Sequence, residues 1–144
     1  MTPVVAVAAI VFDPEGRVLL VERAKPPGVG QWSVPGGKLE GSETLAQAVA
    51  REVREETGLV VEVGPLSCVV ERMSDDFHYV ILDYLARVIG SAHGSSKLVP
   101  VPGTDASAAR WVSPDELLKL PLTEGLLVVL ERARTQHATW RKRS

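Results

Sequence analysis

The pattern of apolar positions predicts a chain of β-strands with helices between and after them. Runs of apolar and β-branched residues bounded by turn formers indicate strands, and they cover residues 4–13, 17–23, 31–34, 59–73, 77–89 and 109–112. The first run is almost wholly apolar, as in a strand buried on both faces. Asp13-Pro14-Glu15-Gly16 follows it with residues that favour a type I turn, so we expect the chain to open with a hairpin. A second turn is expected at Asp75-Asp76.

Helical composition and end signals appear in three places. The segment from Glu43 to Thr57 has small and apolar residues at helical spacing, and Gly58 is a suitable C-terminal stop. The Ser113-Pro114-Asp115-Glu116 segment has the form of a capping box and predicts a short helix to Leu120. A last helix is expected over 123–134, with an apolar stripe formed by Leu126, Leu127, Val129 and Leu130. This order of elements predicts an α/β fold with a helix packed on each side of a sheet.

The remaining segments are expected to be loops or a tail. Residues 24–30 are rich in Pro and Gly and are placed where a loop could overhang a site. Residues 90–103 are expected to form a flexible loop. We expect one domain over residues 1–134, followed by a basic tail, 135–144, that frays.

Composition narrows the classes of function. The chain has 144 residues and a formal net charge of −2, which argues against a nucleic-acid module driven by overall charge. Its single cysteine, Cys68, excludes an intrachain disulfide and is expected to be a buried thiol. The N-terminus does not resemble a signal peptide, and no apolar stretch has the length of a membrane span. We therefore expect a cytoplasmic protein without a membrane or nucleic-acid partner.

A cluster of acidic residues near the end of the first predicted helix is the strongest candidate for a functional site. Glu55 and Glu56 follow Glu52 by three and four residues, which places all three side chains on one helix face. They repel one another and lie near the helix C-terminus, where the helix dipole disfavours anions. A divalent cation with a preference for oxygen ligands would resolve both conflicts. The alternative is a solvated charged face with Arg51 and Arg54 as local partners.

The residues around this cluster favour the metal site. From Gly37 to Leu59, the glycine, glutamate, arginine and aliphatic positions resemble the Nudix box, a signature of 23 residues, at all of its nine defined positions. Outside the box, residues 4–23, 31–37 and 110–117 also resemble segments of the Nudix family. The resemblance implies the Nudix fold, an α/β/α sandwich around a mixed β-sheet.

The resemblance also implies roles for individual residues. Glu52 and Glu56 match the main metal ligands of the family, and Glu55 matches a further ligand or a general base. The backbone carbonyl of Gly36 matches a ligand that some members add, because Pro35-Gly36-Gly37 permits a tight turn and close approach. The scaffold of the box is formed by Gly37, Glu43, Arg51 and Gly58, with an expected ion pair between Glu43 and Arg51.

The residues leave more than one candidate for the general base and for the metal. Glu55 is preferred as the general base and Glu52 is second, because a base must reach the attacking water. Some family members take this acid from a later loop, where Asp105 lies. Mg²⁺ is the expected metal, and Mn²⁺ suits the same oxygen ligands.

The substrate is expected to be a small nucleotide. Segments 23–27, 77–80 and 109–112 resemble ADP-ribose pyrophosphatase-like members, which implies cleavage of ADP-ribose to AMP and ribose 5-phosphate. The alternatives are a (d)NTP pyrophosphohydrolase that releases pyrophosphate, and a Nudix-like ligand sensor without activity. Candidate substrate contacts are Arg23, Trp32, Lys38 and Asp105; packing beneath the loop is the alternative role of Trp32. Homodimers occur among related enzymes, so a homodimer is a further expectation.

Overall fold

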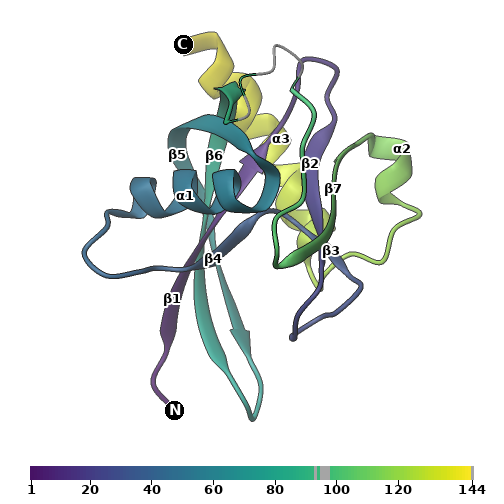
Figure 1. Ribbon diagram of the computed structural model, residues 1–144. Coiled ribbons are helices and arrows are strands. Elements are labelled where there is room, and N and C mark those ends of the chain that lie inside the picture. The colour runs from purple at the N-terminus through teal and green to yellow at the C-terminus, as the bar shows by residue number, and fades with distance from the viewer. Residues whose placement is uncertain (93, 95–97, 144) are drawn as a thin grey trace.

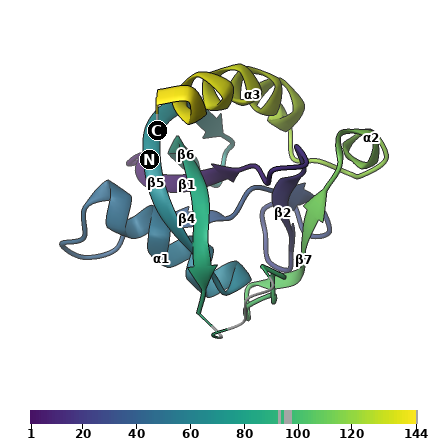
Figure 2. The ribbon, with the colours of Figure 1, turned by 90° about the horizontal axis from the view of Figure 1, so that it is seen from above.

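The computed structural model describes residues 1–92, 94 and 98–143, and its elements form three layers. The strands are β1 (Val4–Val11), β2 (Val18–Arg23), β3 (Trp32–Ser33), β4 (Gly36–Lys38), β5 (Leu59–Met73), β6 (His78–Ser91) and β7 (Ala106–Val112). The helices are α1 (Leu45–Thr57), α2 (Pro114–Leu117) and α3 (Leu126–Arg143). Seen from above, α1 and α3 lie on opposite sides of the strands (Figures 1 and 2), which confirms the predicted α/β/α arrangement.

The strands form one mixed sheet and one antiparallel sheet. One has the order β4-β1-β6-β5, with β1 parallel to β6 and the other neighbours antiparallel; the second has the order β3-β2-β7. The expected opening hairpin is wrong, because β1 and β2 belong to different sheets and share only an isolated bridge between Phe12 and Val18. The turn itself is present, since the Gly16 N–H donates to the Asp13 carbonyl at 3.0 Å. The two strands separate because β1 pairs on both of its edges, with β4 and β6.

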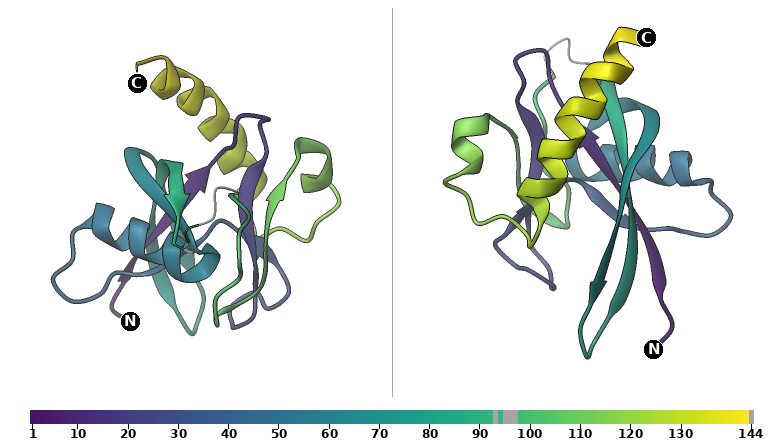
Figure 3. Two further views of the ribbon diagram at one scale, coloured as in Figure 1. Left: turned by 45° about the horizontal axis from the view of Figure 1, so that its top comes forward. Right: turned by 180° about the vertical axis from the view of Figure 1, so that it is seen from behind.

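Both faces of β1 are buried from Ala6 to Val11, as its apolar run predicts. Ala8 and Ile10 face a core cluster that includes residues of α3, whereas Val7 and Ala9 face a cluster that includes residues of α1. Strand β1 therefore separates the two halves of the core. Its position at the centre of the molecule is visible from two further directions in Figure 3.

Helix α1 is fixed at both ends by its own sequence. Thr44 and Gln47 form a capping box, and Gly58 ends the helix with a φ of 71°, a conformation that favours glycine. The helix thus begins at Leu45, and Glu43 lies in the loop before it. The three glutamates of the acidic cluster occupy the last two turns.

Helix α3 extends well beyond its expected end. A tail that frays after Arg134 is wrong, because the helix continues to Arg143; Ser144 lies outside the described residues. The His137 ring lies 5.2 Å from the Phe12 ring, and Trp140 packs against the core cluster beneath the helix. These aromatic residues, three positions apart, prolong the buried face into a segment whose basic residues suggested solvent exposure.

Other boundaries differ locally from expectation. Helix α2 ends at Leu117 rather than Leu120, although its predicted capping box between Ser113 and Glu116 is present. The segment expected as a tight turn, Pro35-Gly36-Gly37, instead leads into strand β4, which pairs with β1. Of the expected loop over 90–103, residues 93 and 95–97 lie outside the described residues, and β6 runs to Ser91. In the part of the chain that the structure describes, no helix is long and apolar enough to cross a membrane.

Candidate active site

Arg51 organises the acidic end of α1. Its guanidinium forms ion pairs with Glu43 at 2.7 Å, Glu52 at 2.8 Å and Glu55 at 3.3 Å. It also donates to the backbone carbonyl of Lys38 at 3.1 Å. The hydrogen bond from Arg51 holds the pKa of Glu43 below its usual value, and the same bond raises the pKa of Arg51. The ion pair expected between Glu43 and Arg51 is therefore present, and it ties α1 to the loop before it and to β4.

Glu56 lies on the side of α1 that faces β4. Its Oε2 accepts a hydrogen bond from the Gly36 N–H at 3.3 Å. Burial, together with the negative charge of Glu52, raises the pKa of Glu56 to about 8. Burial also raises the pKa of Glu52, against the opposing effect of Arg51. Two neighbouring carboxylates, one buried and one half-buried, destabilise the fold when both are charged, and a bound cation would remove that repulsion.

Two glycines of β4 permit this close approach. A Cβ on Gly37 would lie 2.5 Å from Oε1 of Glu52, and a Cβ on Gly36 would lie 2.3 Å from the Val7 carbonyl. Because β4 is the edge strand and the Gly36 N–H donates to Glu56, the peptide groups of Gly36 face α1 rather than β1. The Gly36 carbonyl therefore lies on the edge that faces the glutamates.

The carboxylate oxygens of Glu52, Glu55 and Glu56 suit a hard divalent cation, although they do not converge on one point. Within residues 1–92, 94 and 98–143, no group of three acidic, histidine or cysteine side chains has the geometry of a metal site. Glu52 and Glu55 are turned toward Arg51, whereas Glu56 is turned toward Gly36. The oxygen ligands and the buried negative charge nevertheless match the preference of Mg²⁺, which retains several waters.

A cavity of about 350 Å³ adjoins β4. Its walls come from β1, β4, β5, β6, the loop over 24–30 and the start of α3. The expected contacts Arg23 and Lys38 both line it. Arg23 is held by donation from its Nε to the Pro27 carbonyl at 2.6 Å, and the Lys38 ammonium lies 6.0 Å from the centre of the Tyr79 ring. Cationic side chains therefore stand where the cavity approaches the glutamates.

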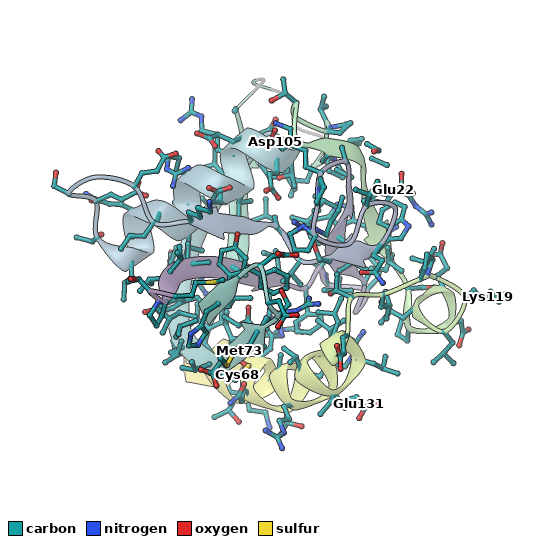
Figure 4. The ribbon with its side chains drawn as sticks, turned by 90° about the horizontal axis from the view of Figure 1, so that it is seen from below. Glu22, Cys68, Met73, Asp105, Lys119 and Glu131 are labelled. Carbon is teal, nitrogen blue, oxygen red and sulfur yellow. The ribbon has the colours of Figure 1, made fainter. Side chains whose placement is uncertain are left out.

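Asp105 lies beside the C-terminal end of α1, as Figure 4 shows. Its loop is anchored there, because the Gly103 N–H donates to the Glu56 carbonyl at 3.1 Å. The Asp105 carboxylate forms an ion pair with Lys25 at 2.6 Å, and its charge contributes to the raised pKa of Glu56. The structure thus brings Asp105 close to the acidic cluster, although Asp105 does not line the cavity.

Trp32 lies in the core rather than on the wall of the cavity. Its side chain is buried in the core cluster beneath α3, and it is absent from the residues that line the cavity. The Arg110 guanidinium lies 5.3 Å from the centre of its ring. This position is that of a packing residue in the core.

Three cavity residues were not singled out from the sequence. Phe77 and Tyr79 form a stacked pair with ring centres 5.4 Å apart, and Asp83 is buried on β6. The sequence contains an indication for Asp83, because a charged residue within an apolar strand pattern is unusual. Cys68, expected as a buried thiol, is half-buried and donates to Asp83.

Comparison with known proteins finds relatives along most of the chain. The family described as NUDIX domain matches residues 2–133. An ADP-ribose pyrophosphatase of Methanocaldococcus jannaschii is 35% identical over 120 residues, which are 82% of this chain and 66% of that protein. A CTP pyrophosphohydrolase of Escherichia coli is 30% identical over 128 residues, which are 88% of this chain and 89% of that protein. The chain therefore spans about two thirds of the length of the Methanocaldococcus relative.

Solved structures with the same fold include a MutT NUDIX hydrolase from Burkholderia pseudomallei. It matches with a TM-score of 0.77 and 31% identity, over 92% of this chain and 98% of that one. The NUDIX domain of Shewanella oneidensis NrtR, solved with ADP ribose, matches with a TM-score of 0.75 and 27% identity, over 94% and 89%. These likenesses confirm the predicted fold.

Proposed function

Because the chain belongs to the Nudix family and is a Nudix hydrolase, we propose that it cleaves the phosphoanhydride linkage of a nucleoside diphosphate derivative at the acidic end of α1. Nudix hydrolases use divalent metal ions. The observation that carries the proposal is the pair of carboxylates, buried Glu52 and half-buried Glu56, held next to each other beside the edge of β4. Such a pair supports a cation site that opens toward a cavity of the size of a small ligand.

Glu52, Glu55 and Glu56 would hold the metal, with the Gly36 carbonyl as a further oxygen ligand. We propose Mg²⁺ as the ion, and Mn²⁺ as one that the same ligands accept. The metal supplies positive charge that neutralises the phosphates and acidifies a water. Arg51 keeps Glu52 and Glu55 oriented, while Arg23 and Lys38 would bind phosphate oxygens from the cavity side.

Glu55 is the proposed general base, with Glu52 as the second candidate. Glu55 is the most exposed member of the cluster, so water can reach its carboxylate, whereas Glu52 is enclosed by Arg51 and Gly37. Asp105, on a later loop, is a further candidate, and its carboxylate is paired with Lys25.

ADP-ribose is the proposed substrate, and AMP and ribose 5-phosphate are the proposed products. Support comes from the Methanocaldococcus relative and from the Shewanella domain solved with ADP ribose. A nucleoside triphosphate, cleaved to a monophosphate and pyrophosphate, is the second candidate, because the Escherichia relative named for CTP covers 88% of this chain.

Product analysis tests the proposal. The purified protein is incubated with Mg²⁺ and ADP-ribose, and in parallel with CTP and dGTP, each with an EDTA control. AMP and ribose 5-phosphate from the first reaction alone would support the leading substrate. A monophosphate and pyrophosphate from a triphosphate alone would retain the metal chemistry and replace the substrate. The absence of Mg²⁺-dependent products in all reactions would contradict the proposed function.

A further inference from the structure

Asp83 is a buried carboxyl group in the floor of the cavity. It lies near the middle of β6 and is 5% exposed. Its cross-strand partner on β1 is Ala8, whose side chain belongs to the core cluster beneath α3 and also lines the cavity. Ile81 and Val129 contribute to the same floor. A carboxyl group among such apolar neighbours is costly unless it forms hydrogen bonds.

The protein itself provides little of this hydrogen bonding. Among the described residues, the one hydrogen bond to the Asp83 carboxyl group comes from the Cys68 thiol, 3.6 Å from Oδ2. A thiol is a weak donor, and a carboxylate can accept several hydrogen bonds. Burial raises the pKa of Asp83 to about 6. The group therefore retains accepting capacity that a ligand in the cavity can use.

The cavity has the dimensions and walls of a nucleoside site. Gly36 and Asp83 flank Ala8 on the two neighbouring strands, so they are separated by about 10 Å, twice the spacing of adjacent strands. This span is comparable to that from the edge of a nucleobase to its 5′-phosphate. The stacked rings of Phe77 and Tyr79 add an aromatic wall to the same cavity, with Tyr79 four residues before Asp83 along β6.

We propose that Asp83 is a specificity-determining residue that accepts a hydrogen bond from the exocyclic amine of a nucleobase and selects amino bases over their keto counterparts. This inference rests on the proposed function, because it assumes a nucleotide whose phosphates lie at β4. The Asp83 oxygen accepts from the amine of adenine or cytosine, whereas the carbonyl of hypoxanthine or uracil would face it oxygen to oxygen. ADP-ribose carries adenine and CTP carries cytosine, so the inference holds for either candidate substrate.

The test is equilibrium binding of nucleoside monophosphates, measured by calorimetry without metal at pH 7.5. AMP and IMP form one pair and CMP and UMP the other, and each pair differs by an amine replaced by a carbonyl. We expect the amino member of at least one pair to bind about tenfold more tightly than its keto partner, as expected for a buried polar contact. Equal binding within both pairs, or binding of none of the four nucleotides, would overturn the inference.

Variants attribute the preference to Asp83. In Asp83→Asn, the amide can turn either its oxygen or its NH₂ group to the base, so the preference should fall to within about threefold while binding is retained. Asp76→Asn, the same change in the exposed turn between β5 and β6, should leave the preference unchanged. An unchanged preference in Asp83→Asn would overturn the inference. Hydrolysis without base preference would leave the proposed function intact, whereas base preference without Mg²⁺-dependent hydrolysis would contradict only the proposed function.

Discussion

The backbone N–H of Gly36 donates to the Glu56 carboxylate over 3.3 Å, which holds the last glutamate of α1 against the edge strand β4. A single peptide N–H does not compensate a buried charge, and the pKa of Glu56 is accordingly raised to about 8 by burial. The protein without metal therefore holds a proton that a cation must displace.

This relationship predicts that metal affinity depends on pH. Below about pH 8 a proton occupies Glu56, so the apparent affinity for Mn²⁺ should rise by up to about tenfold per pH unit between pH 6 and 8, and level off above. Calorimetric titrations with Mn²⁺ at pH 6, 7, 8 and 9 measure it. A pH-independent affinity over this range would show that Glu56 is not a ligand.

Gly37→Ala should impair metal binding more than folding. The added Cβ would lie 2.5 Å from Oε1 of Glu52. The flexible Glu52 side chain can move aside, but its carboxylate then leaves the position in which it would bind the metal. We expect Mg²⁺-dependent turnover to fall about tenfold or more, as is usual when ligand orientation is lost. Gly90→Ala on β6, where a Cβ meets nothing within 4 Å, is the matched control. Equal turnover in the two variants would contradict the placement of Glu52.

Arg51→Gln should reduce turnover about 10- to 100-fold, because Arg51 orients two carboxylates of the proposed metal site and the loop that carries Glu43. Steady-state kinetics at saturating Mg²⁺ measures the loss. Arg54→Gln removes an exposed arginine from the same helix and should have wild-type kinetics. A similar loss in both variants would indicate a general effect of charge on α1.

Asp83→Asn should stabilise the protein at neutral pH. Burial raises the pKa of Asp83 from 3.8 to about 6, so the folded state binds its proton more tightly than the unfolded state does. The wild-type protein therefore loses stability as pH rises from about 4 to 6, by at most about 3 kcal/mol for a difference of two units. Urea unfolding should show similar stability of the two proteins at pH 4 and a more stable variant at pH 7.5. A variant less stable than wild type at pH 7.5 would show that the ionised carboxylate contributes to the fold.

The sequence predicted the features that local chemistry determines. Gly58 is consistent with the observed end of α1, and the apolar run of β1 predicts a strand buried on both faces. The spacing of the glutamates on α1 likewise follows from helical geometry. The expected ion pair between Glu43 and Arg51 joins groups on either side of the helix start, a contact that the resemblance to the Nudix box supplied.

Features that depend on contacts between distant segments were not predictable in this way. The separation of β1 and β2 into two sheets depends on partners, β6 for β1 and β7 for β2, that lie far along the chain. The extension of α3 depends on Trp140 meeting Gly64 on β5. The burial of Trp32 and the position of Asp83 in the cavity also arise from the way the sheets and α3 pack together. Local patterns give no information about such packing.

The most direct test of the central claim compares Mg²⁺-dependent turnover of ADP-ribose, CTP and dGTP by the wild-type protein, Glu56→Gln and Glu131→Gln. Glu131 lies on the outer side of α3 (Figure 4) and receives the same chemical change outside the site. We predict that Glu56→Gln lowers turnover of the preferred substrate by about 100-fold or more, with no loss of stability, because it removes a metal ligand and relieves a buried charge. Glu131→Gln should match the wild type. Full turnover by Glu56→Gln would contradict the assignment of the metal site.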